Sequence, residues 1–97
     1  MQGGIENNVN RWRRQVDLEP LDKTKILNNA FEQSNSIGEY TIHEIVNLDK
    51  PDVAFLCMIL TLDNSTVFIK LKTRLSEINK FRKSFLKFCS SFRYASN

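Results

Sequence analysis

The sequence predicts an α+β domain in which helices pack on a three-stranded antiparallel sheet, in the order helix, helix, strand, strand, strand, helix. Three observations predict this class. Apolar residues recur at helical spacing near both ends of the chain, residues in the middle alternate at strand spacing, and one short central run is apolar throughout. With 97 residues, 41% of them apolar, we expect a single domain over residues 1–97.

The first helix is expected over residues 4–16. Its apolar side chains, which lie within about 60° on a helical wheel, are Ile5, Val9, Trp12 and Val16. Trp12 therefore faces a core. Pro20 limits this helix, because the residue before a proline is pushed out of helical geometry. A short second helix is expected from Asp22, a good N-cap, through Phe31, and the polar run at residues 33–38 ends it.

Three strands are expected at residues 39–47, 53–60 and 67–72. In the first of them Tyr40 and its alternate neighbours share one face, and we expect His43, on the opposite face, to point to solvent. The second strand is apolar on both faces, which is typical of an interior strand.

The last helix is expected from Leu75 to Phe92 and has the clearest pattern in the sequence. One stripe of the helical wheel carries Ile78, Phe81, Phe85, Phe88, Cys89 and Phe92, and the opposite side carries Lys80, Lys83 and Lys87. Burial of each aromatic side chain is worth roughly 1.5 to 3 kcal/mol, so this stripe must cover a sheet or a partner.

Three strands leave two sheet edges, and the apolar middle strand needs cover on both faces. Helices on both faces would supply that cover, as would strands from a second chain or from an additional N-terminal segment. The chain is therefore either a complete domain or the C-terminal part of a larger one. We also expect that it can self-associate through the sheet edges.

Charge is unevenly distributed along the chain. Residues 1–14 carry +2, residues 15–68 carry −6 and residues 69–97 carry +7, which together give the net +3. Such polarity either steers partners or reflects complementarity between neighbouring elements of one domain, and we favour the second interpretation.

Two segments resemble a known family. "GGIENNVNRWRRQVDLEPL" and the closing "STVFIKLKTRLSEINKFRKSFLKFCSSFRY" are similar to a bacterial family of hypothetical proteins and lipoproteins with the signature GG-x-x-x-NVNRWRGQ-x-GL-x-P. The resemblance implies a PsbP-like α/β/α sandwich, of which this chain would be the C-terminal part, and an envelope-associated role. Arg14 and Asp17 stand where that family usually has glycine.

Enzyme chemistry finds little support. His43 is the single histidine, the catalytic and phosphate-binding motifs GxSxG, HExxH, GxGxxG and the P-loop are absent, and Cys57 and Cys89 lie in apolar settings that favour buried, reduced thiols. We therefore expect no enzyme, no cofactor and no metal site.

Basic residues suggest two further partners. Nucleic-acid binding would need exposed aromatic residues or a helix free to enter a groove, and an anionic membrane would need the apolar face that the sheet requires. Both stay as the alternative function. No stretch approaches the roughly 18 to 20 apolar residues of a membrane span, and the first residues lack a secretory apolar run. We expect a cytoplasmic chain, or a periplasmic or envelope-associated one if the N-terminus is truncated.

The predicted function is thus a non-catalytic binding or interaction domain, with a protein partner or a small anionic ligand. Its candidate binding surface is the polar shoulder of the first helix, comprising Asn8, Arg11, Arg13 and Gln15. A guanidinium group beside two amides suits a carboxylate or phosphate. The same groups equally suit hydrogen bonds from the helix to loop carbonyls.

Overall fold

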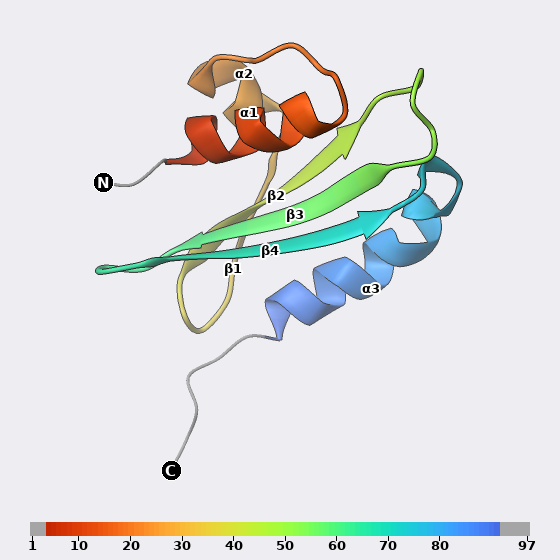
Figure 1. Ribbon diagram of the computed structural model, residues 1–97. Coiled ribbons are helices and arrows are strands. Elements are labelled where there is room, and N and C mark those ends of the chain that lie inside the picture. Colours follow the sequence, from red (N-terminus) through yellow and green to blue (C-terminus); the bar gives the residue numbers. More distant parts are fainter. Residues whose placement is uncertain (1–3, 92–97) are drawn as a thin grey trace.

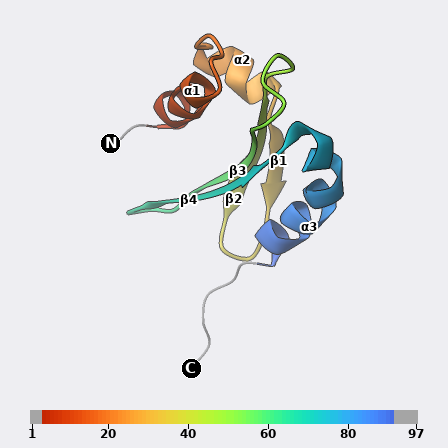
Figure 2. The same cartoon turned by 45° about the vertical axis from the view of Figure 1, so that its right-hand side comes forward.

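The computed structural model describes residues 4–91 and consists of one antiparallel sheet with helices on both faces (Figure 1). The sheet has four strands in sequence order, β1 (Phe31–Ser34), β2 (Glu39–Val46), β3 (Ala54–Thr61) and β4 (Thr66–Thr73). The helices are α1 (Ile5–Gln15), α2 (Lys23–Asn28) and α3 (Ile78–Ser90). Helices α1 and α2 lie on one face and α3 on the other, as Figure 2 shows from the side. The predicted α+β class is confirmed.

The number of strands differs from the prediction. The second helix ends at Asn28 instead of continuing to Phe31, and residues 31–34 form β1, an edge strand paired with β2. A turn explains this strand: the Oδ1 atom of Asn35 accepts hydrogen bonds from the backbone N–H groups of Ile37 and Gly38, which returns the chain antiparallel to β1.

Two hydrophobic cores lie on opposite faces of the sheet. The core under α3 includes Ile42, Leu56, Met58, Leu60, Ile78, Phe85 and Cys89. The core under α1 and α2 includes Val9, Trp12, Val16, Ile26, Ile45, Phe55, Cys57 and Ile59. Successive residues of β3 therefore enter alternate cores, so the prediction of an interior strand covered on both sides is confirmed, as is the burial of Trp12.

Polar contacts fix the position of α3. The guanidinium group of Arg82 donates two hydrogen bonds to the carboxylate of Glu44 on β2. At the other end of the helix, the side-chain amide of Asn35 donates to the carbonyl of Cys89 at 3.2 Å. The Arg82–Glu44 pair joins the basic C-terminal part of the chain to its acidic middle.

The predicted apolar stripe of the last helix is only partly covered. A 3-10 turn at Leu75–Glu77 precedes α3, and Phe85 is buried whereas Phe88 is 52% exposed. The reason is the placement of the helix, since Arg82 holds its opposite flank against β2, leaving Phe88 toward β4 at the sheet edge. Phe92, the last member of the predicted stripe, lies outside the described residues.

Candidate functional site

The four candidate residues of the first helix do not converge on one site. Asn8 is buried, and its side-chain amide donates to the carbonyl of Gly4 at 3.0 Å. The Nε atom of Arg13 donates to the carbonyl of Glu19 at 2.6 Å, and burial lowers the pKa of this guanidinium group. Gln15 and Arg11 are exposed, and their side chains make other contacts.

Gln15 and Arg11 each contact another side chain of the domain. The Oε1 atom of Gln15 accepts a hydrogen bond from the ammonium group of Lys70 on β4 at 2.8 Å. The guanidinium carbon of Arg11 lies 5.9 Å from the centre of the Trp12 ring, within the range of a cation–π contact. The contacts of the four residues thus point in different directions, which favours their use in folding over a shared anion site.

The side-chain amide of Asn10 makes two hydrogen bonds to one residue of the following loop, and sequence reasoning did not single it out as a site residue. Its Nδ2 atom donates to the carbonyl of Leu21, and its Oδ1 atom accepts from the N–H of the same residue, both at 2.8 Å. The Asn10 side chain thus bonds to both backbone groups of Leu21, as a neighbouring strand would. These bonds hold the connection between α1 and α2 in place. The position of Asn10 inside the resemblance motif was the available signal.

The end of α1 is a Schellman motif built around Asp17. The N–H of Leu18 donates to the carbonyl of Arg13, and the N–H of Asp17 donates to the carbonyl of Arg14. Asp17 has φ 61°, in the left-handed region where glycine is least strained.

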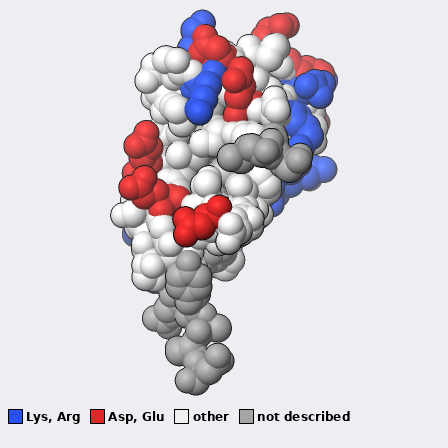
Figure 3. Space-filling view, turned by 90° about the vertical axis from the view of Figure 1, so that its left-hand side faces the viewer, with Lys and Arg blue, Asp and Glu red and all other residues white. Residues whose placement is uncertain are grey.

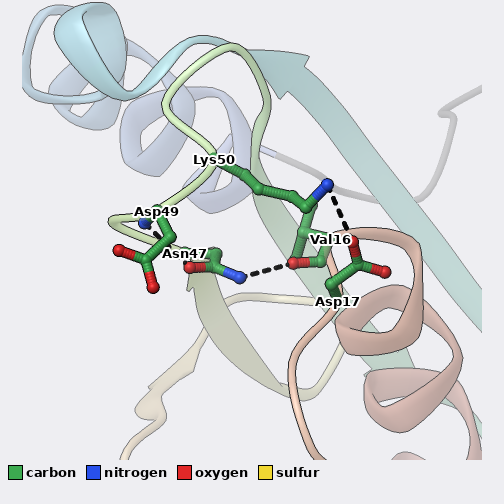
Figure 4. Close-up of polar contacts among 5 residues, drawn as sticks. All are labelled: Val16, Asp17, Asn47, Asp49 and Lys50. Atoms are coloured by element: carbon green, nitrogen blue, oxygen red, sulfur yellow. Dashed lines mark hydrogen bonds and ion pairs between the residues drawn. The ribbon is translucent and has the colours of Figure 1, made fainter.

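The loop between β2 and β3 anchors the end of this helix (Figure 4). The amide of Asn47 donates to the carbonyl of Val16 at 2.8 Å while its Oδ1 atom accepts from the N–H of Asp49. Lys50 forms an exposed ion pair with Asp17 at 2.8 Å, which raises the pKa of the Lys50 ammonium group. The residues that follow α1 are therefore held to the loop between β2 and β3.

His43 and Cys57 lie on neighbouring strands, where they are register partners on the α1 face. The prediction that His43 faces solvent was wrong: the residue is 4% exposed, because the helical layer covers this face, and its ring bonds to the hydroxyl of Thr41 at 2.8 Å. Burial lowers the pKa of His43 to about 4 and raises the pKa of the Cys57 thiol to about 12. At neutral pH both groups are uncharged, so the two do not form a thiolate–imidazolium pair.

The second cysteine, Cys89, belongs to α3 and is buried between this helix and the sheet. Burial raises the pKa of the Cys89 thiol to about 11, and both cysteines are free, as the sequence predicted. Within residues 4–91 the structure has no group of three or more His, Cys, Asp or Glu residues that could hold a metal ion. In the same part of the chain no helix is long and apolar enough to cross a membrane.

An open acidic hollow of about 770 Å³ lies at the end of the sheet that α1 leaves uncovered. Ile59 contributes to its lining from β3, and Glu32 on β1 and Glu39 on β2 bring carboxylates to it. Figure 3 looks onto this end of the molecule, where acidic side chains gather on one flank and basic side chains on the other. The acidic flank includes an edge strand, β1, all four residues of which are exposed.

The opposite edge of the sheet, β4, borders an apolar groove of about 280 Å³. The apolar side chains that line it are Ile69 and Leu71 of β4 and Phe81, Phe85 and Phe88 of α3. On its other face β4 carries Phe68, which is 41% exposed and packs edge-on against Trp12 at 6.2 Å between ring centres. This edge strand thus has partly exposed apolar side chains on both faces.

Lysines lie on both faces of the sheet near the β4 edge. Lys70 and Lys72 are exposed on the α1 face of the strand, and Lys70 lies over the Phe55 ring at 4.4 Å. Lys80 lies over the ring of Phe81, which lines the groove, at 5.6 Å. The β4 edge is therefore apolar in the groove and basic around it, whereas the β1 edge has carboxylates beside it.

A scan of protein-family models and searches of curated proteins and of solved structures found no match to this chain.

Proposed function

We propose that this chain is a non-catalytic interaction domain that binds an extended segment of a protein partner along β4. The observation that carries this proposal is the state of that edge. β4 pairs with β3 on one side, no other described strand lies along its second side, and apolar side chains on both of its faces are partly exposed. An added strand would pair with the backbone of β4 and cover those side chains at the same time.

Charge indicates what the partner segment contains. An extended segment places alternate side chains on opposite faces of the sheet. Toward α3 it would meet the apolar groove, and toward α1 it would meet Lys70 and Lys72. A segment that alternates apolar and acidic residues complements both surfaces, and electrostatic complementarity of this kind favours specificity and fast association.

The family resemblance is compatible with this role. We propose kinship with the GG-x-x-x-NVNRWRGQ-x-GL-x-P family and its PsbP-like sandwich, in which helices cover both faces of an antiparallel sheet. Support comes from the helices on both faces here and from the left-handed backbone of Asp17, where the family usually has glycine. In that arrangement the motif residues, Asn10 among them, stabilise the first helix and its following loop.

Binding of a short fluorescent peptide tests the function. The probe alternates valine and glutamate, and a second peptide has lysine at every glutamate position. We expect the acidic peptide to bind and the lysine peptide not to bind, and Lys70→Glu combined with Lys72→Glu to weaken the acidic peptide by about tenfold or more. Lys83→Glu combined with Lys87→Glu, an equal charge change at two exposed α3 residues outside the groove lining, is the matched control. Equal binding of both peptides would refute the proposal.

Nucleic acid is the alternative partner for the basic surface, because Lys83 and Lys87 of α3 are exposed. Titration with single-stranded nucleic-acid homopolymers distinguishes nucleic-acid binding from binding of a protein segment. Binding through phosphates falls steeply with salt and includes Lys83 as much as Lys70. On the present proposal, the acidic peptide binds, the homopolymer does not, and only the β4 lysines matter.

A further inference from the structure

The two edges of the sheet complement each other in both side-chain chemistry and strand direction. β1 has Phe31 on the α3 face, 51% exposed, and Glu32 on the α1 face, also exposed. β4 has an apolar groove on the α3 face and exposed lysines on the α1 face. The β4 edge needs a partner with an apolar residue on one face and an acidic residue on the other, and the adjacent residues Phe31 and Glu32 of the opposite edge have this arrangement.

We infer that β4 of one copy pairs with β1 of a second copy, so that the chain assembles head to tail into a continuous sheet. This inference rests on the proposed function and names the partner. Because each strand in the order β1-β2-β3-β4 is antiparallel to the next, β4 runs antiparallel to β1, and a second copy placed beside the first without inversion meets it in antiparallel register.

The register follows from the charges. With Glu32 of the second copy opposite Lys70, antiparallel pairing places Phe31 of that copy opposite Leu71. Phe31 then enters the groove beside Phe88 and Phe81, while Glu32 has Lys70 across from it and Lys72 on the diagonal. Phe31 and Phe88, the exposed aromatic residues on the α3 face of the two edges, become covered in one step.

The α3 layer leaves room for this contact. Neighbouring strands are spaced by roughly 4.8 Å, so four strands separate equivalent helices of adjacent copies by roughly 19 Å, whereas packed helices need only about 8 to 10 Å between axes. Each α3 would therefore stand clear of the next, and the Phe31 side chain would lie in the interval between them. A contact between two different edges leaves one β1 edge and one β4 edge unpaired in a dimer, so the assembly grows beyond a dimer into a larger ring or a filament.

Sedimentation velocity of the full chain over rising concentration tests the assembly. We expect a mass that increases past the dimer, and we expect Glu32→Lys alone or Lys70→Glu alone to weaken the association by about tenfold or more, since each change places like charges opposite each other. An equimolar mixture of these two variants restores complementary charges at every junction, so the mixture should assemble when neither variant does. Glu39→Lys makes the same charge change on β2, beside the edge strand, and should leave assembly intact.

Three results would overturn the inference: a wild-type monomer at every concentration, a mass that stops at a dimer, or a mixture of the two charge variants that stays dissociated. The fluorescent peptide distinguishes this failure from failure of the proposed function. If the chain stays monomeric and yet binds the valine–glutamate peptide through Lys70, the β4 edge serves a different protein and only the self-assembly is wrong. Circular dichroism confirms that each variant is folded, which is expected because Glu32, Glu39 and Lys70 are exposed.

Discussion

The first helix and the β4 edge differ in the direction in which their chemical groups act. On α1 the amides of Asn8 and Asn10 and the guanidinium group of Arg13 all bond to backbone carbonyls of the same chain. On β4 partly exposed apolar side chains and exposed lysines lie at a sheet edge. The comparison teaches that a conspicuous polar motif can serve the fold, while the surface that we propose for interaction lies where strand pairing is incomplete.

Because His43 is buried under the α1 layer, we expect the largest effect from acid, which should destabilise the folded chain through protonation of this residue. The unfolded histidine has a pKa near 6.5 and the folded one has a pKa of about 4. Between these values the unfolded chain binds more protons, so stability is lost as the pH falls from 6.5 to 4, by roughly 3 kcal/mol. Urea unfolding at a series of pH values measures this loss. In His43→Phe the same series should be nearly flat over that window, and an unchanged slope in this variant would assign the acid sensitivity to other groups.

The next largest effect is expected at Asn10. Asn10→Ala removes both hydrogen bonds to Leu21 and leaves a partly buried N–H and carbonyl without their partner, which should lower the free energy of unfolding by roughly 1 to 3 kcal/mol. Asn7→Ala, on an exposed position of the same helix, is the matched control and should change it little. Thermal or urea unfolding measures both effects. Equal effects of the two substitutions would contradict the conclusion that the polar groups of α1 serve the fold.

A smaller change in stability is expected at Asp17, at the end of α1, and two substitutions there should differ in its direction. Because its φ is 61°, Asp17→Gly should hold or raise stability, whereas Asp17→Val should lose about 1 to 2 kcal/mol to backbone strain. Thermal unfolding of the two variants measures the difference. A glycine variant less stable than the valine variant would show that the ion pair with Lys50, and not the backbone conformation, decides this position.

Helices and strands with a strong hydrophobic periodicity were predictable from the sequence, whereas elements defined by tertiary contacts were not. The spacing from Ile5 to Val16 and the apolar run of β3 identify their structures directly. β1 escaped prediction because its four residues are all exposed and carry no burial pattern, although the turn residues that follow it were a usable signal.

The candidate site was harder to predict for the same reason. Alternation places His43 opposite Tyr40, but only the packing of the α1 layer decides that its face is buried. Asn10 and Leu21 are 11 positions apart, so their pairing depends on the path of the intervening loop. The β4 groove depends on where α3 crosses the sheet, which helical periodicity does not specify.

The last test separates stability from binding at the edge. Phe88 is 52% exposed and lines the β4 groove, so Phe88→Ser should lower the free energy of unfolding by less than about 1 kcal/mol while it weakens binding of the valine–glutamate peptide severalfold. Leu48→Ser changes a more exposed apolar residue, 78% exposed in the loop between β2 and β3, and should affect neither quantity. A Phe88 variant that loses stability but keeps its binding would place this side chain with the core under α3, and the contrast with α1 would then rest on the lysines of β4 alone.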